Sequence, residues 1–91
     1  MKQLKESDIR KQIRDYLRLK GWYVMYFLAG LGAFPGLSDM AVIKEGRVLW
    51  VEIKKSGGKQ SEKQIEFQRQ IEAHGGTYII ATSIDDLEEI C

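Results

Sequence analysis

The sequence predicts one small α/β domain in which a mixed β-sheet is flanked by helices on both faces. Three observations predict it: a helix-period apolar stripe opens the chain, two adjacent segments are apolar on both faces, and a strand–helix–strand unit follows. The 91 residues suffice for one hydrophobic core, so we expect a single domain over 1–91. The expected order of elements is helix, three strands, helix, strand, helix (αβββαβα).

The first helix is expected over residues 5–20, where apolar residues recur at the spacing of one buried helical stripe. The stripe consists of Ile9, Ile13, Tyr16 and Leu17. Gly21 supplies a typical C-terminal stop. Aromatic and branched residues then predict a strand over 22–28, and the glycines and proline of 29–36 predict a loop.

A hairpin is expected next, with strands over 39–44 and 47–55 joined at Glu45-Gly46. Both strands are apolar on both faces, and such a sheet needs helices above and below it. The turn also fixes the register, because paired residue numbers must sum to 91. Asp39 is then directly opposite Glu52, with Cβ atoms about 4.5–5.5 Å apart.

The rest of the chain is expected to form a crossover. Ser61 to Gln64 has the spacing of a capping box, which opens a helix running to about His74. A strand over 77–81 should lie parallel to the second hairpin strand, because a strand–helix–strand unit makes a right-handed crossover. Ser83 is expected to cap a last helix.

Composition excludes several classes of function. The single cysteine, Cys91, cannot form an internal disulfide, and the single histidine, His74, excludes a His-rich metal cluster or a zinc finger. No apolar run reaches the ~18 residues of a membrane span, and the N-terminus has no signal-like apolar region. We therefore expect a cytoplasmic protein with no membrane partner.

Charge is distributed unevenly although the net charge is only +1. The first twenty residues carry seven basic side chains against three acidic ones. Two interpretations stay open: a face that binds a polyanion, or a well-solvated helix surface. The basic residues that would form a DNA-binding surface are Arg10, Lys11, Arg14 and Arg18 on the first helix, and Lys55 and Lys59 after the hairpin.

The opposed carboxylates of Asp39 and Glu52 suggest metal chemistry. Facing carboxylates repel one another, whereas a divalent cation between them turns the repulsion into ligation. Lys54 follows Glu52 on the same face, where it could orient a water or stabilise charge in phosphoryl transfer. The alternative is a surface aspartate beside a Glu–Lys ion pair. Glycine-containing loops, nearby lysines and a helix N-terminus at the same end favour an anionic polymer as the substrate.

The chain carries, in this order, Glu6 in the first helix, Gly36 with Asp39, Glu52 with Lys54, and Gln64 in the second helix. This ordered set resembles the motifs of the PD-(D/E)XK nuclease superfamily and, more narrowly, of a VRR-NUC (virus-type replication-repair nuclease) domain. Ser38 departs from the superfamily pattern, in which proline precedes the aspartate. The resemblance covers nearly all of the chain and implies a restriction-endonuclease-like core.

The resemblance implies a metal-dependent endodeoxyribonuclease without an organic cofactor. The ligands of Mg²⁺, or of Mn²⁺ in its place, would be Asp39, Glu52 and the Ile53 carbonyl. Lys54 would be the catalytic lysine, Gln64 would position water or phosphate, and Glu6 would be an outer or second-metal ligand. Gln64 and Glu6 also have structural interpretations, as a capping-box residue and as a first-turn acid.

Stand-alone domains similar to this one act as homodimers on branched DNA such as four-way (Holliday) junctions. The resemblance therefore implies DNA repair or replication in a bacterium or a phage-infected host. Independently of the resemblance, the apolar side chains of Leu28, Leu31 and Phe34 suggest an exposed patch that could cover the dimer face. One alternative is a non-catalytic module that binds DNA structures, and another is a flap or nicking nuclease. A further class is an α/β interaction domain with no nucleic-acid partner.

Overall fold

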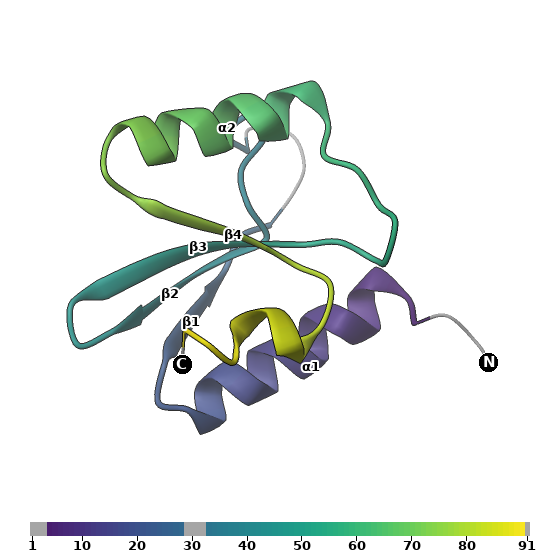
Figure 1. Cartoon of the computed structure of the whole chain (residues 1–91), viewed down its shortest axis with the longest axis vertical. Helices are drawn as coiled ribbons and strands as arrows, with labels where there is room; N and C mark the ends of the chain where they lie inside the picture. Colours follow the sequence, from purple (N-terminus) through teal and green to yellow (C-terminus); the bar gives the residue numbers. More distant parts are fainter. Residues whose placement is uncertain (1–3, 29–32, 91) are drawn as a thin grey trace.

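Four strands form one mixed sheet, and helices cover both of its faces (Figure 1). The computed structural model describes residues 4–28 and 33–90. Its elements are α1 (Glu6–Leu19), β1 (Tyr23–Tyr26), β2 (Met40–Lys44), β3 (Arg47–Ile53), α2 (Glu62–Ala73), β4 (Thr77–Ala81) and the 3₁₀ helix η1 (Ile84–Leu87). The predicted fold class and order of elements are confirmed. Within the described ranges, no helix has the length and apolar run needed to cross a membrane.

The sheet order is β1-β2-β3-β4, with β1, β2 and β3 antiparallel and β4 parallel to β3. On one face, Ile9, Ile13 and Leu17 of α1 are buried in the main core, and η1 lies beside α1. On the other face, the Phe67 ring of α2 lies 5.8 Å from Trp50 and 6.2 Å from Tyr78. The hairpin is apolar on both faces because each face is covered by a helix (Figure 1).

The β2–β3 hairpin has the register predicted from its turn. Glu45 and Gly46 both have positive φ, 51° and 81°, as a type I′ turn requires. Lys44 pairs with Arg47, and the ladder runs in step to Met40 and Val51. Asp39 directly precedes Met40 and Glu52 directly follows Val51, so the two carboxylates come next to the last pair of the β2–β3 ladder.

The predicted capping box opens α2. The Ser61 hydroxyl accepts from the Gln64 backbone N–H at 3.2 Å, and the Gln64 side-chain oxygen accepts from the Ser61 N–H at 2.8 Å. The helix ends at Ala73, with His74 as its C-cap. The His74 Nδ1 lies 2.7 Å from the Gln70 carbonyl oxygen, which agrees with a structural role at the helix end.

The last helix differs from the prediction. It is a single 3₁₀ turn, and Ser83 makes no side-chain cap. The Asp86 carboxylate instead accepts from the Thr82 N–H and hydroxyl at 2.7 and 3.0 Å, and these hydrogen bonds lower its pKa. Asp86 thus satisfies the Thr82 donors, and Leu87 is already buried in the core. A single 3₁₀ turn is therefore sufficient at this end of the chain.

Candidate active site

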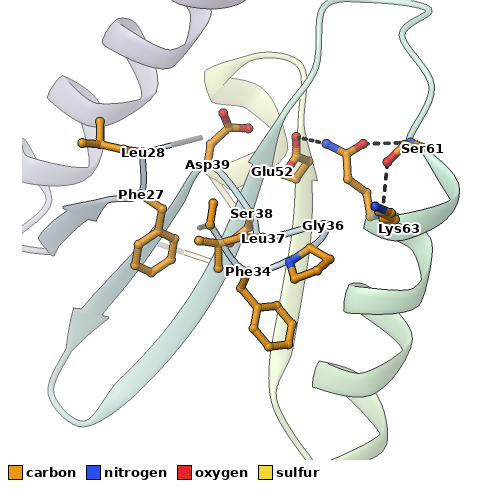
Figure 2. Close-up of a pocket in the computed structure, with 13 residues that line it drawn as sticks. Phe27, Leu28, Phe34, Gly36, Leu37, Ser38, Asp39, Glu52, Ser61 and Lys63 are labelled. Atoms are coloured by element: carbon orange, nitrogen blue, oxygen red, sulfur yellow. Dashed lines mark hydrogen bonds between the residues drawn. The ribbon is translucent and has the colours of Figure 1, made fainter. Parts of the chain in front are cut away.

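A cleft of about 360 Å³ lies where β2 begins and β3 ends (Figure 2). Asp39 and Glu52 line it from these two neighbouring strands, so the hairpin places both carboxylates in one cavity. The first turn of α2 forms one wall with Ser61, Lys63 and Gln64, and the 33–38 segment forms another. The two carboxylates that the predicted hairpin register places close together therefore line the same cleft in the structure.

Glu52 is the most buried charged group of the cleft, with 3% of its surface exposed. Its Oε2 accepts from the Gln64 side-chain N–H at 3.2 Å and lies 3.6 Å from the Lys54 Nζ. Its Oε1 is buried and has no hydrogen-bond partner within the described residues. A buried carboxylate oxygen without a partner is costly, so this atom marks a place where a cation or a water belongs.

Burial and the adjacent Asp39 carboxylate raise the pKa of Glu52 to about 8, against the opposing effect of Lys54. Between pH 4.5 and about 8, Glu52 therefore keeps its proton in the native protein but has released it in the unfolded chain, where its pKa is near the ordinary value of 4.5. Proton release from a buried carboxylate is favoured once a cation binds beside it. The electrostatics of the cleft thus agree with a metal ligand at this position.

We expect the stability of the metal-free protein to fall as pH rises from about 4.5 through 8, because the unfolded state then binds fewer protons than the native state. The fall should be on the order of a few kcal/mol and should level off above the raised pKa. Urea unfolding with EDTA at pH 5.5, 7.0 and 8.5 measures it. Glu52→Gln should remove most of the slope, and parallel profiles for the two proteins would contradict the raised pKa.

Asp39 has both carboxylate oxygens engaged. Oδ2 accepts from the Ile53 backbone N–H at 2.7 Å, which holds the aspartate against the end of β3. Oδ1 accepts from the Arg10 guanidinium at 2.8 Å. Arg10 was predicted from the sequence to belong with the DNA-binding basic residues of the first helix, and its contact with Asp39 was not predicted. The helical period of the first helix places Arg10 beside the buried stripe, but it does not show which strand end packs against that side of the helix.

Gln64 combines the two interpretations left open for it. Its side-chain oxygen closes the capping box, while its side-chain N–H donates to Glu52. Glu6 lies in the first turn of α1 and is not among the residues that line the cleft. No group of three His, Cys, Asp or Glu residues that could hold a metal occurs in 4–28 and 33–90. The role of Glu6 as an outer or second-metal ligand stays a prediction.

The donor set that remains fits a hard divalent cation. Mg²⁺ uses one or two protein carboxylates and keeps several waters, and Asp39 and Glu52 supply those carboxylates in one cleft. Of the oxygens of these two carboxylates, the buried Glu52 Oε1 has no hydrogen-bond partner in the described chain. The Ile53 carbonyl as a third ligand stays a prediction.

The segment before Asp39 is shaped by two small residues. The buried Ser38 hydroxyl donates to the Met40 carbonyl at 3.2 Å, so serine starts β2 without the proline of the superfamily pattern. Gly36 has φ +75° and lies against the backbone of Lys63 in α2, where a Cβ atom would collide with the Lys63 carbonyl. This contact fixes the distance between the loop and the wall that carries Gln64.

The basic residues of α1 divide into two places. Arg10, Lys11 and Arg14 line a second cleft, of about 420 Å³, which shares Asp39 with the first. Arg18 lies beyond it, at a separate depression beside Trp22. The first three members of the predicted row therefore line a cleft that includes Asp39, Arg10 among them contacts its carboxylate, and Arg18 lines the separate depression. Lys55 and Lys59 are exposed on the loop after β3.

The residues predicted for a dimer face lie around the first cleft. Leu28 and Phe34 both line it and are 88% and 66% exposed. Leu31 falls outside the described residues. Two exposed apolar side chains at the mouth of a cleft are consistent with contact to a partner or to a substrate, so the dimer face stays a prediction.

Comparison with known proteins supports the same class of fold. No protein-family model matches the chain, and no curated protein matches its sequence significantly. A solved structure described as a VRR_NUC domain matches with a TM-score of 0.79, covering 93% of this chain and 91% of that one. The two sequences are 20% identical over this match. The chain therefore has the fold of a VRR_NUC domain, as the ordered motif residues predicted, and the likeness at this identity shows the fold alone.

Proposed function

We propose that this protein is a metal-dependent endodeoxyribonuclease that hydrolyses phosphodiester bonds, with a preference for branched DNA such as four-way junctions. One observation supports this most directly: Asp39 and Glu52 share a cleft in which a buried Glu52 oxygen has no hydrogen-bond partner among the described residues, while Lys54 lies beside the same carboxylate. The VRR_NUC fold supports the nuclease class. Mg²⁺ is the proposed ion, with Mn²⁺ as a substitute.

The chain's own residues have distinct roles in this proposal. Asp39, Glu52 and the Ile53 carbonyl hold the cation, which when bound neutralises charge that develops on the phosphate oxygens. Lys54 places its ammonium group near the scissile phosphate, because its Nζ lies 3.6 Å from Glu52. Gln64 holds the Glu52 carboxylate in place through a hydrogen bond of 3.2 Å.

A panel of DNA substrates tests the proposal. Duplex, flap, splayed and four-way-junction DNA would each be incubated with the protein in Mg²⁺, Mn²⁺ or EDTA. We expect cleavage in either metal and none in EDTA, with the four-way junction cut fastest. Glu52→Gln, which preserves the size of the side chain, should lose cleavage together with the tight site for Mn²⁺.

The panel also separates the alternatives. Junction binding without cleavage in any metal would favour a non-catalytic module, and faster cleavage of flap or nicked substrates would favour a flap or nicking nuclease. Absence of any salt-dependent DNA binding would favour an interaction domain. The homodimer and the location in a bacterial or phage-infected cytoplasm stay predictions based on the resemblance.

The second cleft gives a prediction about the DNA surface. Lys11 and Arg14 line it without contacting Asp39, so replacing both with Gln tests DNA binding without disturbing the carboxylates. Each lost phosphate contact should flatten the slope of log affinity against log salt by roughly one unit. We expect junction binding to weaken more than short-duplex binding, measured by fluorescence anisotropy from 50 to 300 mM salt. An unchanged slope and affinity would mean that this helix face is only solvated.

A further inference from the structure

The ion pair between Arg10 and Asp39 has no part in the chemistry proposed above. It joins α1 to the start of β2 across 29 residues of sequence, with Nη2 and Oδ1 2.8 Å apart. The other Asp39 oxygen is already taken by the Ile53 N–H at 2.7 Å. The Arg10 guanidinium therefore competes with a cation for the Asp39 oxygen that does not bond to the Ile53 N–H.

The two cations compete for the same carboxylate. A guanidinium held on Oδ1 satisfies the negative charge of Asp39 and lowers the attraction of that oxygen for a metal ion. The Asp39 side chain is only 16% exposed, so the Coulomb interaction is screened less than at an open surface. A metal ion bound through Oδ1 of Asp39 thus competes with Arg10 and weakens this contact.

Arg10 is placed where DNA can remove it. Its side chain is 37% exposed, and it lines the cleft that also contains Lys11 and Arg14. Phosphate and carboxylate are equivalent partners for the planar donor fork of arginine. A DNA phosphate in this cleft therefore gives the Arg10 guanidinium another anion to pair with. The Asp39 carboxylate then pairs with a metal ion in place of the guanidinium.

We propose that Arg10 is a positioning residue that keeps Asp39 from the metal until a DNA phosphate engages its guanidinium, so that DNA binding and metal binding reinforce each other. This inference rests on the proposed nuclease function and on a metal at Asp39 and Glu52. Its consequence is a protein that loads its cation preferentially on DNA. By linkage, the factor by which DNA tightens metal binding equals the factor by which metal tightens DNA binding.

The decisive measurement is Mn²⁺ affinity in the absence of DNA, by isothermal titration calorimetry and electron paramagnetic resonance. Arg10→Gln, and Arg10→Met, which keeps the apolar stem, should bind Mn²⁺ on the order of tenfold more tightly than the wild type. Arg14→Gln is the matched control: Arg14 lies one helical turn away and pairs with Asp15 at 2.9 Å. Its Mn²⁺ affinity should stay within about twofold of the wild type. If Arg10 had only a structural role, replacing it would not tighten Mn²⁺ binding.

The second measurement adds a short phosphorothioate duplex, which keeps the phosphate charge and resists hydrolysis, with metal binding to the duplex alone subtracted. The duplex should tighten Mn²⁺ binding in the wild type by a larger factor than in Arg10→Gln. Wild-type and Arg10 variants with equal Mn²⁺ affinity would overturn the inference while leaving the nuclease proposal intact. Absence of any Mn²⁺ binding that depends on Glu52, tested with Glu52→Gln, would overturn both.

Discussion

Lys54→Met should lower the cleavage rate at saturating DNA by on the order of a thousandfold while leaving the fold and most of the DNA affinity unchanged. Lys54 is the lysine whose Nζ lies 3.6 Å from Glu52, and only 15% of its side chain is exposed. Methionine keeps the length and volume of the buried stem and removes the charge. The loss should therefore appear in kcat, because the ammonium group acts on charge that develops in the transition state.

Lys55→Met provides the comparison for this prediction. It removes the same charge from the next residue, but Lys55 is exposed on the loop and is predicted only to contact DNA. Its effect should be a rise in KM with kcat within about threefold of the wild type, because a uniform binding contact is lost. Single-turnover cleavage of a junction, with binding followed by anisotropy, distinguishes the two variants. Near-normal kcat for Lys54→Met would remove Lys54 from the mechanism.

The part of the site that depends on short-range geometry was predictable from the sequence. A two-residue turn at Glu45-Gly46 fixes the register of the whole hairpin, since a slip of one residue would reverse every side chain. The predicted placement of Asp39 opposite Glu52 extends that register by one step beyond Met40 and Val51, the last pair of the ladder. The capping box at Ser61 and Gln64 was also readable, because it needs only a fixed spacing and the start of a helix.

The contacts that depend on how separate elements pack were not predictable. The position of Arg10 on α1 follows from the helical period, but its pairing with Asp39 depends on the angle between α1 and the sheet. Likewise, Gln64 reaches Glu52 only because the first turn of α2 and the end of β3 line the same cleft. At the C-terminal end, Asp86 took the role expected of Ser83 because its carboxylate bonds back to Thr82.

Gly36 connects these two levels, because a local backbone property decides a long-range contact. The residue has φ +75°, and a Cβ there would meet the carbonyl of Lys63 and crowd the backbone N–H of Gln64. These are backbone atoms of the first turn of α2, which cannot rotate away as the end of a flexible side chain can. The glycine in the G-x-x-D segment thus lets the loop approach the turn that holds Gln64 against Glu52.

Gly36→Ala should therefore destabilise the protein by on the order of 3 kcal/mol and weaken Mn²⁺ binding, since either the loop or the start of α2 must move. Gly57→Ala is the matched control: Gly57 also has a positive φ, +80°, but a Cβ there would meet nothing within 4 Å. That variant should show only the backbone strain of about 1–2 kcal/mol and normal Mn²⁺ affinity. Urea unfolding and calorimetric Mn²⁺ titration measure both effects. If Gly36→Ala costs no more than Gly57→Ala, close packing against Lys63 is not what requires glycine at this position.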